Sequence, residues 1–330
     1  MAVANVKQDA KVVHGGDLDL ARRRFPQAPE PWLDLSTGIN PTAYPVEAVA
    51  AEAWSRLPGR ADEQALRIAA ARRFEVHNPA TIVAAPGTQA LIQLLPRLVP
   101  QARVAIVGPT YEEHEVCWRR HGHDVTVVSD LACANGHDVA IVVNPDNPTG
   151  RLLPVAELAT RHAMLVVDEA FVDFLPAAAS LARDLPSNAV VLRSFGKTYG
   201  LAGLRLGFAI ARPDLADRLR TEFGPWPVSG PALAIGRAAL ADDAWFRATT
   251  ARLKEDSSRL DAMLAKAGFT LLGGTPLFRL ARHPHAAGIV ERLGQQGIHV
   301  RAFAHEPHWL RFGLPGSDMA FRRLAAALGI

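Results

Sequence analysis

The sequence predicts an α/β fold: a large domain with a mostly parallel sheet covered by helices, followed by a smaller α+β domain. Two observations lead to this expectation. Short apolar runs alternate with helix-like segments over the first two thirds of the chain, and glycine-rich or polar turns follow the ends of those runs. Such alternation is typical of parallel sheets with helices on both faces. After about residue 220 the pattern changes, which marks a second structural region.

The strands of the parallel sheet are expected at short runs of Val, Ile, Leu and Ala. Runs of this kind are buried on both faces of a sheet, and they occupy residues 81–85, 104–107, 125–128, 139–143, 165–167, 190–192 and 207–210. Helical patterns cover residues 90–98, which Pro100 ends, and residues 112–121. Each helix follows a strand, as a parallel sheet requires.

The second region begins with a proline-rich link at residues 223–231. A long charged helix is expected over 243–267, and shorter strands near 270–272, 277–280, 299–301 and 310–312. We therefore divide the chain into an N-terminal arm (1–44), a large domain (45–222) and a small C-terminal domain (223–330). The arm is expected to contribute to the small domain and to a substrate pocket.

Composition favours a globular cytoplasmic protein. The 330 residues are 49% hydrophobic and 21% charged, and a net charge of +3 is too small to indicate a nucleic-acid partner. No stretch has the length of a membrane span or a signal peptide, so we expect neither. Cys117 and Cys133 are too few for a disulfide framework. In the tract 305–308 a proline disrupts the spacing of metal ligands on a helix, so no metal is expected.

Lys197 is the first candidate catalytic residue. It follows the apolar run 190–192 and precedes a glycine-rich turn, where partial burial would lower the pKa of its amine and suit it to form a Schiff base. Ser194 and Arg205 flank it with groups that bind phosphate. An amine of this kind beside a phosphate clamp indicates pyridoxal 5'-phosphate. The alternative is an ordinary loop lysine.

Two more polar groups follow strand-like runs. Asp168 ends the run that begins at 165, and a carboxylate there can pair with a protonated pyridine nitrogen. Asn147 follows the run 139–143 and can donate a hydrogen bond to the ring oxygen of the cofactor. Helix capping by Asp168 and simple turn chemistry around Asn147 are the alternatives. The order of the two residues before Lys197 favours the cofactor interpretation.

A third junction fits a phosphate cradle. Gly87, Thr88 and Gln89 join a strand to a helix, so their backbone N–H groups and the helix dipole would face an anion. Helix capping explains the same residues. Near the C-terminus, Arg301 and Arg311 each interrupt an apolar strand, and a buried guanidinium requires an anionic partner. That partner is either a ligand or a carboxylate of the chain itself.

The order of Asn147, Asp168, Ser194, Lys197 and Arg205 resembles that of the fold type I pyridoxal-phosphate enzymes, the aminotransferase family. The resemblance runs from His14 to about residue 313. It is strongest to the branch that holds histidinol-phosphate aminotransferases and the L-threonine O-3-phosphate decarboxylases of cobalamin biosynthesis. The segments 14–17 and 31–41 are similar to those of the decarboxylases.

This resemblance implies a lyase that decarboxylates L-threonine O-3-phosphate to (R)-1-amino-2-propanol O-2-phosphate. It implies that Tyr111 stacks on the pyridine ring, that Arg311 binds the substrate carboxylate and that Arg301 binds its phosphate. Further residues expected in the substrate pocket are His14, Gly38, Asn40 and Asn147. A homodimer is also implied. A histidinol-phosphate-type aminotransferase remains the alternative, and a non-catalytic ligand-binding relative is a third.

The sequence departs from the family pattern at two places. Phe171 stands where many relatives have a tyrosine that donates to the cofactor's ring oxygen, which leaves Asn147 to make that contact alone. Relatives also often have a tyrosine that reaches the cofactor phosphate of the neighbouring subunit, and here the corresponding residue is Leu57. The cross-subunit hydrogen bond is therefore in question, although the dimer is not.

Overall fold

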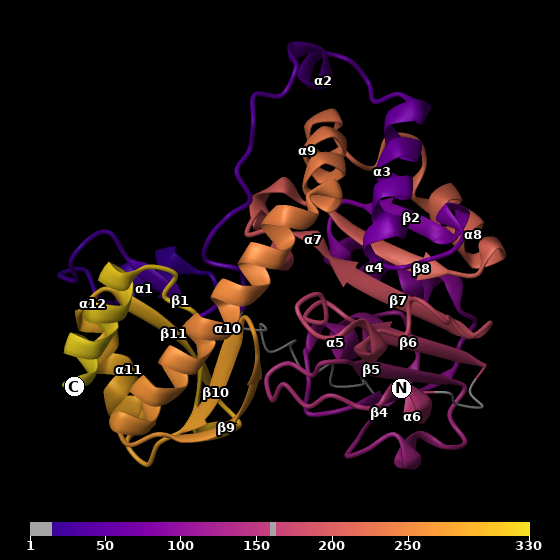
Figure 1. Cartoon of the computed structure of the whole chain (residues 1–330). Coiled ribbons are helices and arrows are strands. Elements are labelled where there is room, and N and C mark those ends of the chain that lie inside the picture. The colour runs from indigo at the N-terminus through magenta and orange to yellow at the C-terminus, as the bar shows by residue number, and fades with distance from the viewer. Residues whose placement is uncertain (1–14, 159–162) are drawn as a thin grey trace, which may run out of the picture.

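The computed structural model of the chain describes residues 15–158 and 163–330. Their strands form two sheets, one of seven strands and one of five, which lie side by side (Figure 1). Helices cover both sheets. The arrangement confirms the predicted α/β class and the change of architecture in the second part of the chain.

The larger sheet has the strand order β2-β8-β7-β6-β5-β3-β4. The strand β8 runs antiparallel to both neighbours, whereas the pairs from β7 to β4 are all parallel. The bounds are β2 (Ile82–Ala85), β3 (Arg103–Val107), β4 (Asp124–Val128), β5 (Val139–Val143), β6 (Met164–Asp168), β7 (Ala189–Ser194) and β8 (Gly207–Ala211). Every predicted apolar run of this region is a strand.

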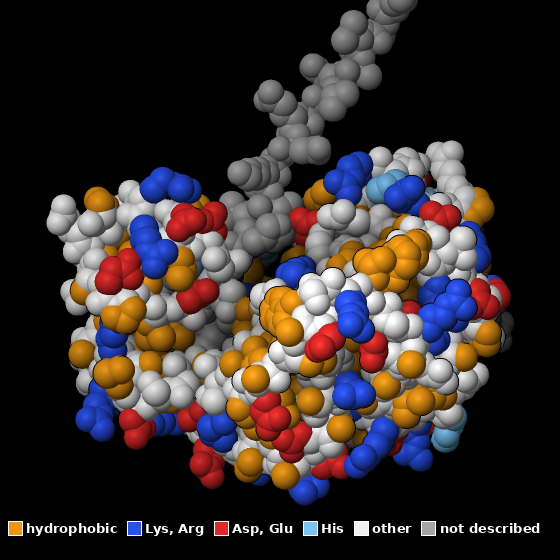
Figure 2. Space-filling view, turned by 90° about the horizontal axis from the view of Figure 1, so that it is seen from above, with side chains coloured by type: hydrophobic (Ala, Val, Ile, Leu, Met, Phe, Trp, Pro, Cys, Tyr) orange, Lys and Arg blue, Asp and Glu red, His pale blue; other side chains and the backbone are white. Residues whose placement is uncertain are grey.

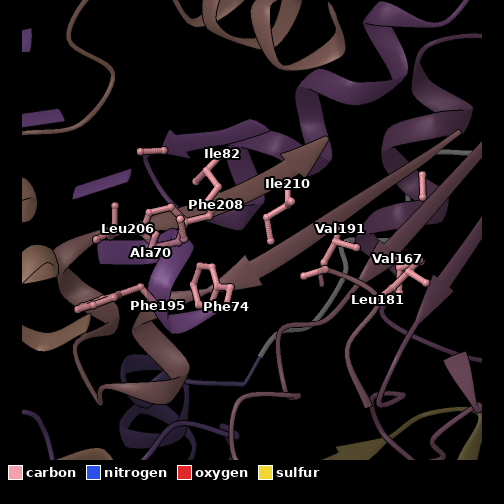
Figure 3. Packing of buried hydrophobic residues seen from close by; sticks show 14 of the residues in the cluster. Ala70, Phe74, Ile82, Val167, Leu181, Val191, Phe195, Leu206, Phe208 and Ile210 are labelled. Carbon is pink, nitrogen blue, oxygen red and sulfur yellow. The ribbon is translucent and has the colours of Figure 1, made fainter. Parts of the chain in front are cut away.

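Helices pack on both faces of this sheet, and one core cluster lies between the sheet and α3. Phe74, Phe195 and Phe208 belong to this cluster (Figure 3). The predicted helix at 90–98 begins earlier and ends as a 3-10 helix over Leu95–Leu98. The helices are α2 (Ala51–Ser55), α3 (Arg60–Arg73), α4 (Thr88–Leu94), α5 (Glu113–Arg120), α6 (Val155–Leu158), α7 (Phe195–Thr198), α8 (Pro213–Phe223) and α9 (Gly230–Ala241).

The smaller sheet has the order β1-β11-β12-β10-β9. The strand β1 comes from the N-terminal part of the chain and runs parallel to β11, so the two ends of the chain share this sheet. Its strands are β1 (Leu33–Leu35), β9 (Thr270–Thr275), β10 (Phe278–Arg282), β11 (Ile298–Phe303) and β12 (Glu306–Gly313). The accompanying helices are α1 (Leu18–Arg24), α11 (Ala286–Gln295) and α12 (Asp318–Leu328).

The long helix α10 (Asp243–Lys266) connects the two sheets (Figure 1). Near its start Trp245 packs against the core of the larger sheet, whereas Leu253 and Leu260 lie in the core of the smaller one. The helix α9, which follows the predicted boundary at 223, packs on α3 and places Leu233 in the larger core. Within the described ranges, no helix combines the length and apolar composition that crossing a bilayer requires.

Candidate active site

A cavity of about 320 Å³ opens at the edge of the larger sheet where its parallel strands end. The strands β5, β6 and β7 run in the same direction, so the residues that follow them meet at this edge. Ligands of open α/β sheets bind at such edges. The cavity brings together most of the predicted site residues: Gly38, Gly87, Thr88, Gln89, Tyr111, Asn147, Asp168, Ser194, Lys197, Arg205 and Arg311.

Lys197 lies on the short helix α7, directly after β7. Its Nζ is 5.0 Å from the centre of the Phe171 ring. Burial lowers the pKa of the Lys197 amine, as do the positive charges of Arg311 and Arg205, while the Asp168 carboxylate acts in the opposite direction. An amine with a lowered pKa is deprotonated more readily and is a better nucleophile. The interpretation of Lys197 as an ordinary loop lysine does not account for this placement.

Asp168 is the last residue of β6 and is almost completely buried. Burial by itself would raise the pKa of this carboxyl group, but the hydrogen bond from His114 and the charge of Lys197 outweigh that effect and lower the pKa. The His114 Nε2 atom lies 3.1 Å from Asp168 Oδ2. The Asp168 carboxylate therefore stays ionised inside the cavity wall.

His114 did not emerge from the sequence as a site residue. It lies on α5, one helical turn before Cys117 and Trp118, and all three side chains are buried. The sequence indicates only that His114 is a titratable residue on the buried face of a predicted helix. A histidine that belongs to the core and has a partner there would have the same spacing, so the sequence does not distinguish the two.

The turn after β2 approaches Arg205 closely. Gly87 has a φ of +87°, and a Cβ atom there would lie 2.7 Å from Arg205 Nη2. Gly207 allows a second close approach, since its Cβ would lie 2.5 Å from the backbone nitrogen of Thr88. Ser194, at the end of β7, is buried in the same cavity. Guanidinium, hydroxyl and backbone N–H groups together form a donor set that suits a phosphate.

Gln89 makes its side-chain contacts within the chain. Its Oε1 accepts a hydrogen bond of 3.2 Å from the Tyr111 hydroxyl, and its Nε2 donates to Glu113 Oε2. Burial and the nearby charges of Glu113 and Asp168 raise the pKa of the Tyr111 hydroxyl. Tyr111 consequently remains neutral, and its ring is held at the cavity by Gln89.

Arg301 and Arg311 lie side by side in the smaller sheet, because they are directly paired residues of the neighbouring strands β11 and β12. Arg311 is buried and donates to Asn147 Oδ1 and, over 2.7 Å, to the Ser36 carbonyl. Burial and the charge of Arg301 lower the pKa of Arg311 to about 10. Burial also lowers the pKa of Arg301.

The described part of the chain offers these two arginines no carboxylate partner. Among the residues that the structure describes, neither Arg301 nor Arg311 forms a salt bridge, and the Nε atom of Arg311 is buried without a hydrogen-bond partner. A smaller cavity of about 80 Å³ lies beside them and shares Gly15, Tyr111, Asn147 and Arg311 with the larger one. Within residues 15–158 and 163–330 the internal salt bridge considered from the sequence is not formed, which leaves both guanidinium groups available to an anionic ligand.

The residues predicted from the N-terminal segments have different placements. Gly38 lies at the cavity, where a Cβ atom would come within 2.7 Å of the Phe171 ring. Asn40 is buried beneath Lys197: its backbone nitrogen donates to the Lys197 carbonyl, and its Nδ2 donates to the Thr198 carbonyl, each over 2.9 Å. His14 lies outside the described residues. Asn40 thus holds the lysine segment instead of facing the cavity.

The two departures from the family pattern also have clear placements. Phe171 packs edge-on against Phe278, with their ring centres 5.0 Å apart, and lines the cavity without a hydroxyl. Leu57 is 68% exposed. It follows α2, which projects far from the end of the sheet that carries α7 (Figure 1). Leu57 therefore makes no contribution to the cavity of its own chain.

Comparisons with known proteins agree with this geometry. The model of the family aminotransferase class I and II matches residues 30–328. A threonine-phosphate decarboxylase from a Sinorhizobium species is 45% identical, over 97% of this chain and 98% of the relative. A threonine-phosphate decarboxylase from Pseudomonas aeruginosa is 39% identical, over 96% of each chain. The structure of histidinol-phosphate aminotransferase from Sinorhizobium meliloti in complex with pyridoxal-5'-phosphate has the same fold (TM-score 0.78, 24% identity, 99% and 97% of the two chains).

Proposed function

The chain belongs to the class I and II aminotransferase family, and from this we propose that it is a pyridoxal-phosphate-dependent lyase acting on L-threonine O-3-phosphate. The product is (R)-1-amino-2-propanol O-2-phosphate, which serves cobalamin biosynthesis. One observation carries the choice of substrate: two arginines that are paired in the smaller sheet form no salt bridge with any described residue, and Arg311 borders the cavity that holds Lys197 while Arg301 borders the smaller cavity beside it. Relatives that match nearly the whole chain carry the name of this enzyme. Family membership also confirms the fold type I prediction.

The donor groups of the cavity fit pyridoxal phosphate. Arg205, Ser194 and the backbone of Gly87 and Thr88 would hold its phosphate, where the missing Cβ of Gly87 leaves room beside the guanidinium. Asp168 would pair with its ring nitrogen and Tyr111 would stack on its ring. The Nδ2 group of Asn147 would donate to its ring oxygen, since Oδ1 already accepts from Arg311. Lys197 would hold it covalently.

Arg311 and Arg301 would bind the two anionic groups of the substrate. L-Threonine O-3-phosphate carries an α-carboxylate and a phosphate on neighbouring carbons, and the paired arginines offer two guanidinium groups side by side. Arginine forms two parallel hydrogen bonds with either anion. The carboxylate would bind Arg311, which reaches the larger cavity, and the phosphate would bind Arg301 in the smaller one. Gly38 leaves space for the substrate beside Phe171.

The reaction needs an electron sink and a proton donor. When bound, pyridoxal phosphate supplies the sink for the electron pair that remains on Cα after CO₂ leaves. Asp168 would keep the cofactor's ring nitrogen protonated, because the hydrogen bond from His114 and the charge of Lys197 lower the pKa of its carboxyl group in spite of burial and leave it ionised. Lys197 Nζ, free once the substrate amine has taken its place, would take up the proton that the substrate ammonium group loses and would then pass it to Cα. The buried position of Asp168 also keeps water away from this charge pair.

Release of labelled CO₂ from carboxyl-labelled L-threonine O-3-phosphate, with no keto-acid acceptor, tests this function. A decarboxylase releases CO₂ over many turnovers. An aminotransferase releases none, and instead converts its cofactor once to the amine form when histidinol phosphate is added. That second outcome would replace the proposed activity with transamination.

We also propose that the active molecule is a cytoplasmic homodimer. Each chain would have three parts, bounded at residues 44/45 and 222/223, with α9 packing back on the core of the larger sheet from beyond the second boundary. Support for the dimer comes from α2 and its neighbours, which carry the exposed side chains of Trp54 (71%) and Leu57 (68%). Hydrophobic side chains gather in several patches on the face seen from above Figure 1 (Figure 2). Exposed apolar patches of this kind mark protein interfaces. Cys117 and Cys133 are free thiols, as is usual in the reducing cytoplasm.

A further inference from the structure

A cluster of buried charged and polar side chains lies directly behind the wall of the cavity. Three of its members adjoin a cavity residue in the sequence: Glu169 follows Asp168, Arg193 precedes Ser194, and Thr198 follows Lys197. Successive side chains of a strand point to opposite faces. Where Ser194 faces the cavity, Arg193 therefore points away from it and into the cluster.

Asp173 joins the two ends of the segment that carries Ser194 and Lys197. One of its carboxylate oxygens, Oδ1, accepts a hydrogen bond from Arg193 Nη2. The other, Oδ2, accepts from the Thr198 hydroxyl. A single carboxylate thus connects residues 193 and 198, between which both cavity residues lie.

Arg193 extends this connection to the neighbouring strand. Its Nη1 lies 3.3 Å from Glu169 Oε2 and donates to the Ser180 hydroxyl over 3.1 Å. Glu169 also accepts a hydrogen bond of 2.6 Å from the backbone nitrogen of Leu181. The ends of β6 and β7 are therefore tied together one residue beyond Asp168 and one residue before Ser194.

Burial makes these contacts strong. The exposed fractions of the Glu169, Asp173 and Arg193 side chains are 0%, 7% and 6%. Removing one partner of a buried ion pair leaves the other charge without compensation, which is costly. The Arg193 guanidinium also lies 4.3 Å from the centre of the Phe74 ring, which limits its movement.

We propose that Asp173 is a positioning residue for the cofactor: by holding Arg193 and Thr198 it keeps Ser194 and Lys197 in place in the wall of the cavity. Asp173 acts through these neighbours and touches neither cofactor nor substrate. The proposal rests on the proposed cofactor role of Lys197, but it is independent of the substrate. Loss of the Asp173 contacts frees α7, so the bond between Lys197 and the cofactor forms less favourably.

The test compares Asp173→Asn and Thr198→Val with two controls. Thr198→Ser keeps the hydroxyl, and Asp261→Asn removes a charge from a carboxylate that pairs with Arg279 in the smaller sheet region, over 2.5 Å. Each holoenzyme is prepared with pyridoxal phosphate and diluted, and the absorbance of the lysine-bound cofactor is followed over time. The same absorbance measured against pH gives the pKa of the lysine–cofactor linkage.

We expect Asp173→Asn and Thr198→Val to release the cofactor about tenfold faster, as the loss of one buried hydrogen bond to a charged group implies. The pKa of the linkage should shift in both variants. Thr198→Ser should restore both values, and Asp261→Asn should change neither, even where it lowers the melting temperature.

The proposal is overturned if Asp173→Asn and Thr198→Val release the cofactor at the same rate as Asp261→Asn and have the same linkage pKa. Asp173 would then be a purely structural residue. If Asp173→Asn does not fold, the pair Thr198→Val and Thr198→Ser decides alone. A chain that binds the cofactor through Lys197 but releases no CO₂ from threonine phosphate would contradict the proposed function only.

Discussion

At the scale of single residues, the proposed roles of the paired arginines distinguish binding of the substrate phosphate from binding at the cofactor end of the site. Arg311 reaches the larger cavity and holds Asn147, whereas Arg301 lines only the smaller one. A change at Arg301 should therefore affect the phosphorylated end of the substrate and spare the cofactor. The two arginines differ in this respect although they are direct neighbours in the sheet.

We expect Arg301→Ala to raise the KM for L-threonine O-3-phosphate by about 10- to 100-fold, since a hydrogen bond to a charged group contributes about 1.5–3 kcal/mol. Binding of unphosphorylated L-threonine should change little. Competition assays with both compounds measure the difference. Equal losses for the two would remove Arg301 from the phosphate site.

His114 should contribute more to the stability of the fold at neutral pH than at acidic pH. Asp168 has a lowered pKa in the folded protein, so its ionised form stabilises the fold fully above pH about 4, near its ordinary pKa. This stabilisation is lost as the pH falls through the lowered value. We expect His114→Phe to reduce the free energy of unfolding by about 1–3 kcal/mol at pH 7, because it removes a buried partner of the carboxylate.

Urea unfolding over a series of pH values measures this effect. The difference in the free energy of unfolding between the unaltered protein and His114→Phe should become smaller below pH about 4, where Asp168 becomes protonated in the unfolded chain. His121→Phe, on the exposed end of the same helix, is the control. A difference that is the same at every pH would mean that His114 contributes through packing alone.

The residues at the ends of strands were the ones that the sequence located well. Asp168, Ser194 and Lys197 each follow an apolar run, and parallel strands place such ends together. Asn40 was expected in the substrate pocket, but its bonds to the Lys197 and Thr198 carbonyls depend on a contact across 158 residues. Local spacing carries no information about such a contact. The same holds for the role of His114.

At the scale of elements, the turn from β2 into α4 depends on the absence of a side chain. Gly87 needs both its positive φ and the space beside Arg205. Gly122 has a similar φ of +82°, but a Cβ there would have no neighbour within 4 Å. The two glycines thus share the backbone requirement and differ in the space requirement.

We expect Gly87→Ala and Gly122→Ala to destabilise the protein by a similar amount of about 1 kcal/mol or more, since L residues are strained at positive φ. Only Gly87→Ala should also weaken the affinity for pyridoxal phosphate, because its Cβ displaces the Arg205 guanidinium. Cofactor titration and thermal unfolding of both variants separate the two effects. Unchanged affinity in Gly87→Ala would exclude this turn from the phosphate site.

The strands were easier to predict than the helices. The buried strands of the larger sheet are continuous apolar runs, so their positions follow from composition alone. In contrast, charged and polar residues are interspersed along α3, and its buried residues are Leu66, Ala70 and Ala71. This helix is stabilised by its packing against α9, and tertiary packing of this kind cannot be predicted from the sequence.

At the scale of the whole molecule, α2 is the part that stands apart from both cores. None of its residues is buried in the single chain, and Trp54 is largely exposed. A large aromatic side chain in this position would be covered in the proposed dimer.

We expect Trp54→Glu to weaken the dimer, because it places a charge in an apolar interface. Light scattering after size-exclusion chromatography measures the mass at several concentrations. Met319→Glu, which changes a side chain that is 79% exposed on α12, should leave the mass unchanged. A Trp54→Glu protein with the dimer mass of the unaltered chain would place the interface elsewhere.

The long helix α10 has a consequence for substrate size. Lys197 and Asp168 belong to the larger sheet region, whereas Arg301 and Arg311 belong to the smaller sheet, and α10 packs against the cores of both. The distance between the reacting carbon and the phosphate-binding group is therefore not set within either sheet. In the proposed function this distance would depend on how the two sheets are placed relative to one another, which the packing of α10 and the hydrogen bond from Arg311 to Asn147 fix, so the spacing of the sheets would select the length of the substrate.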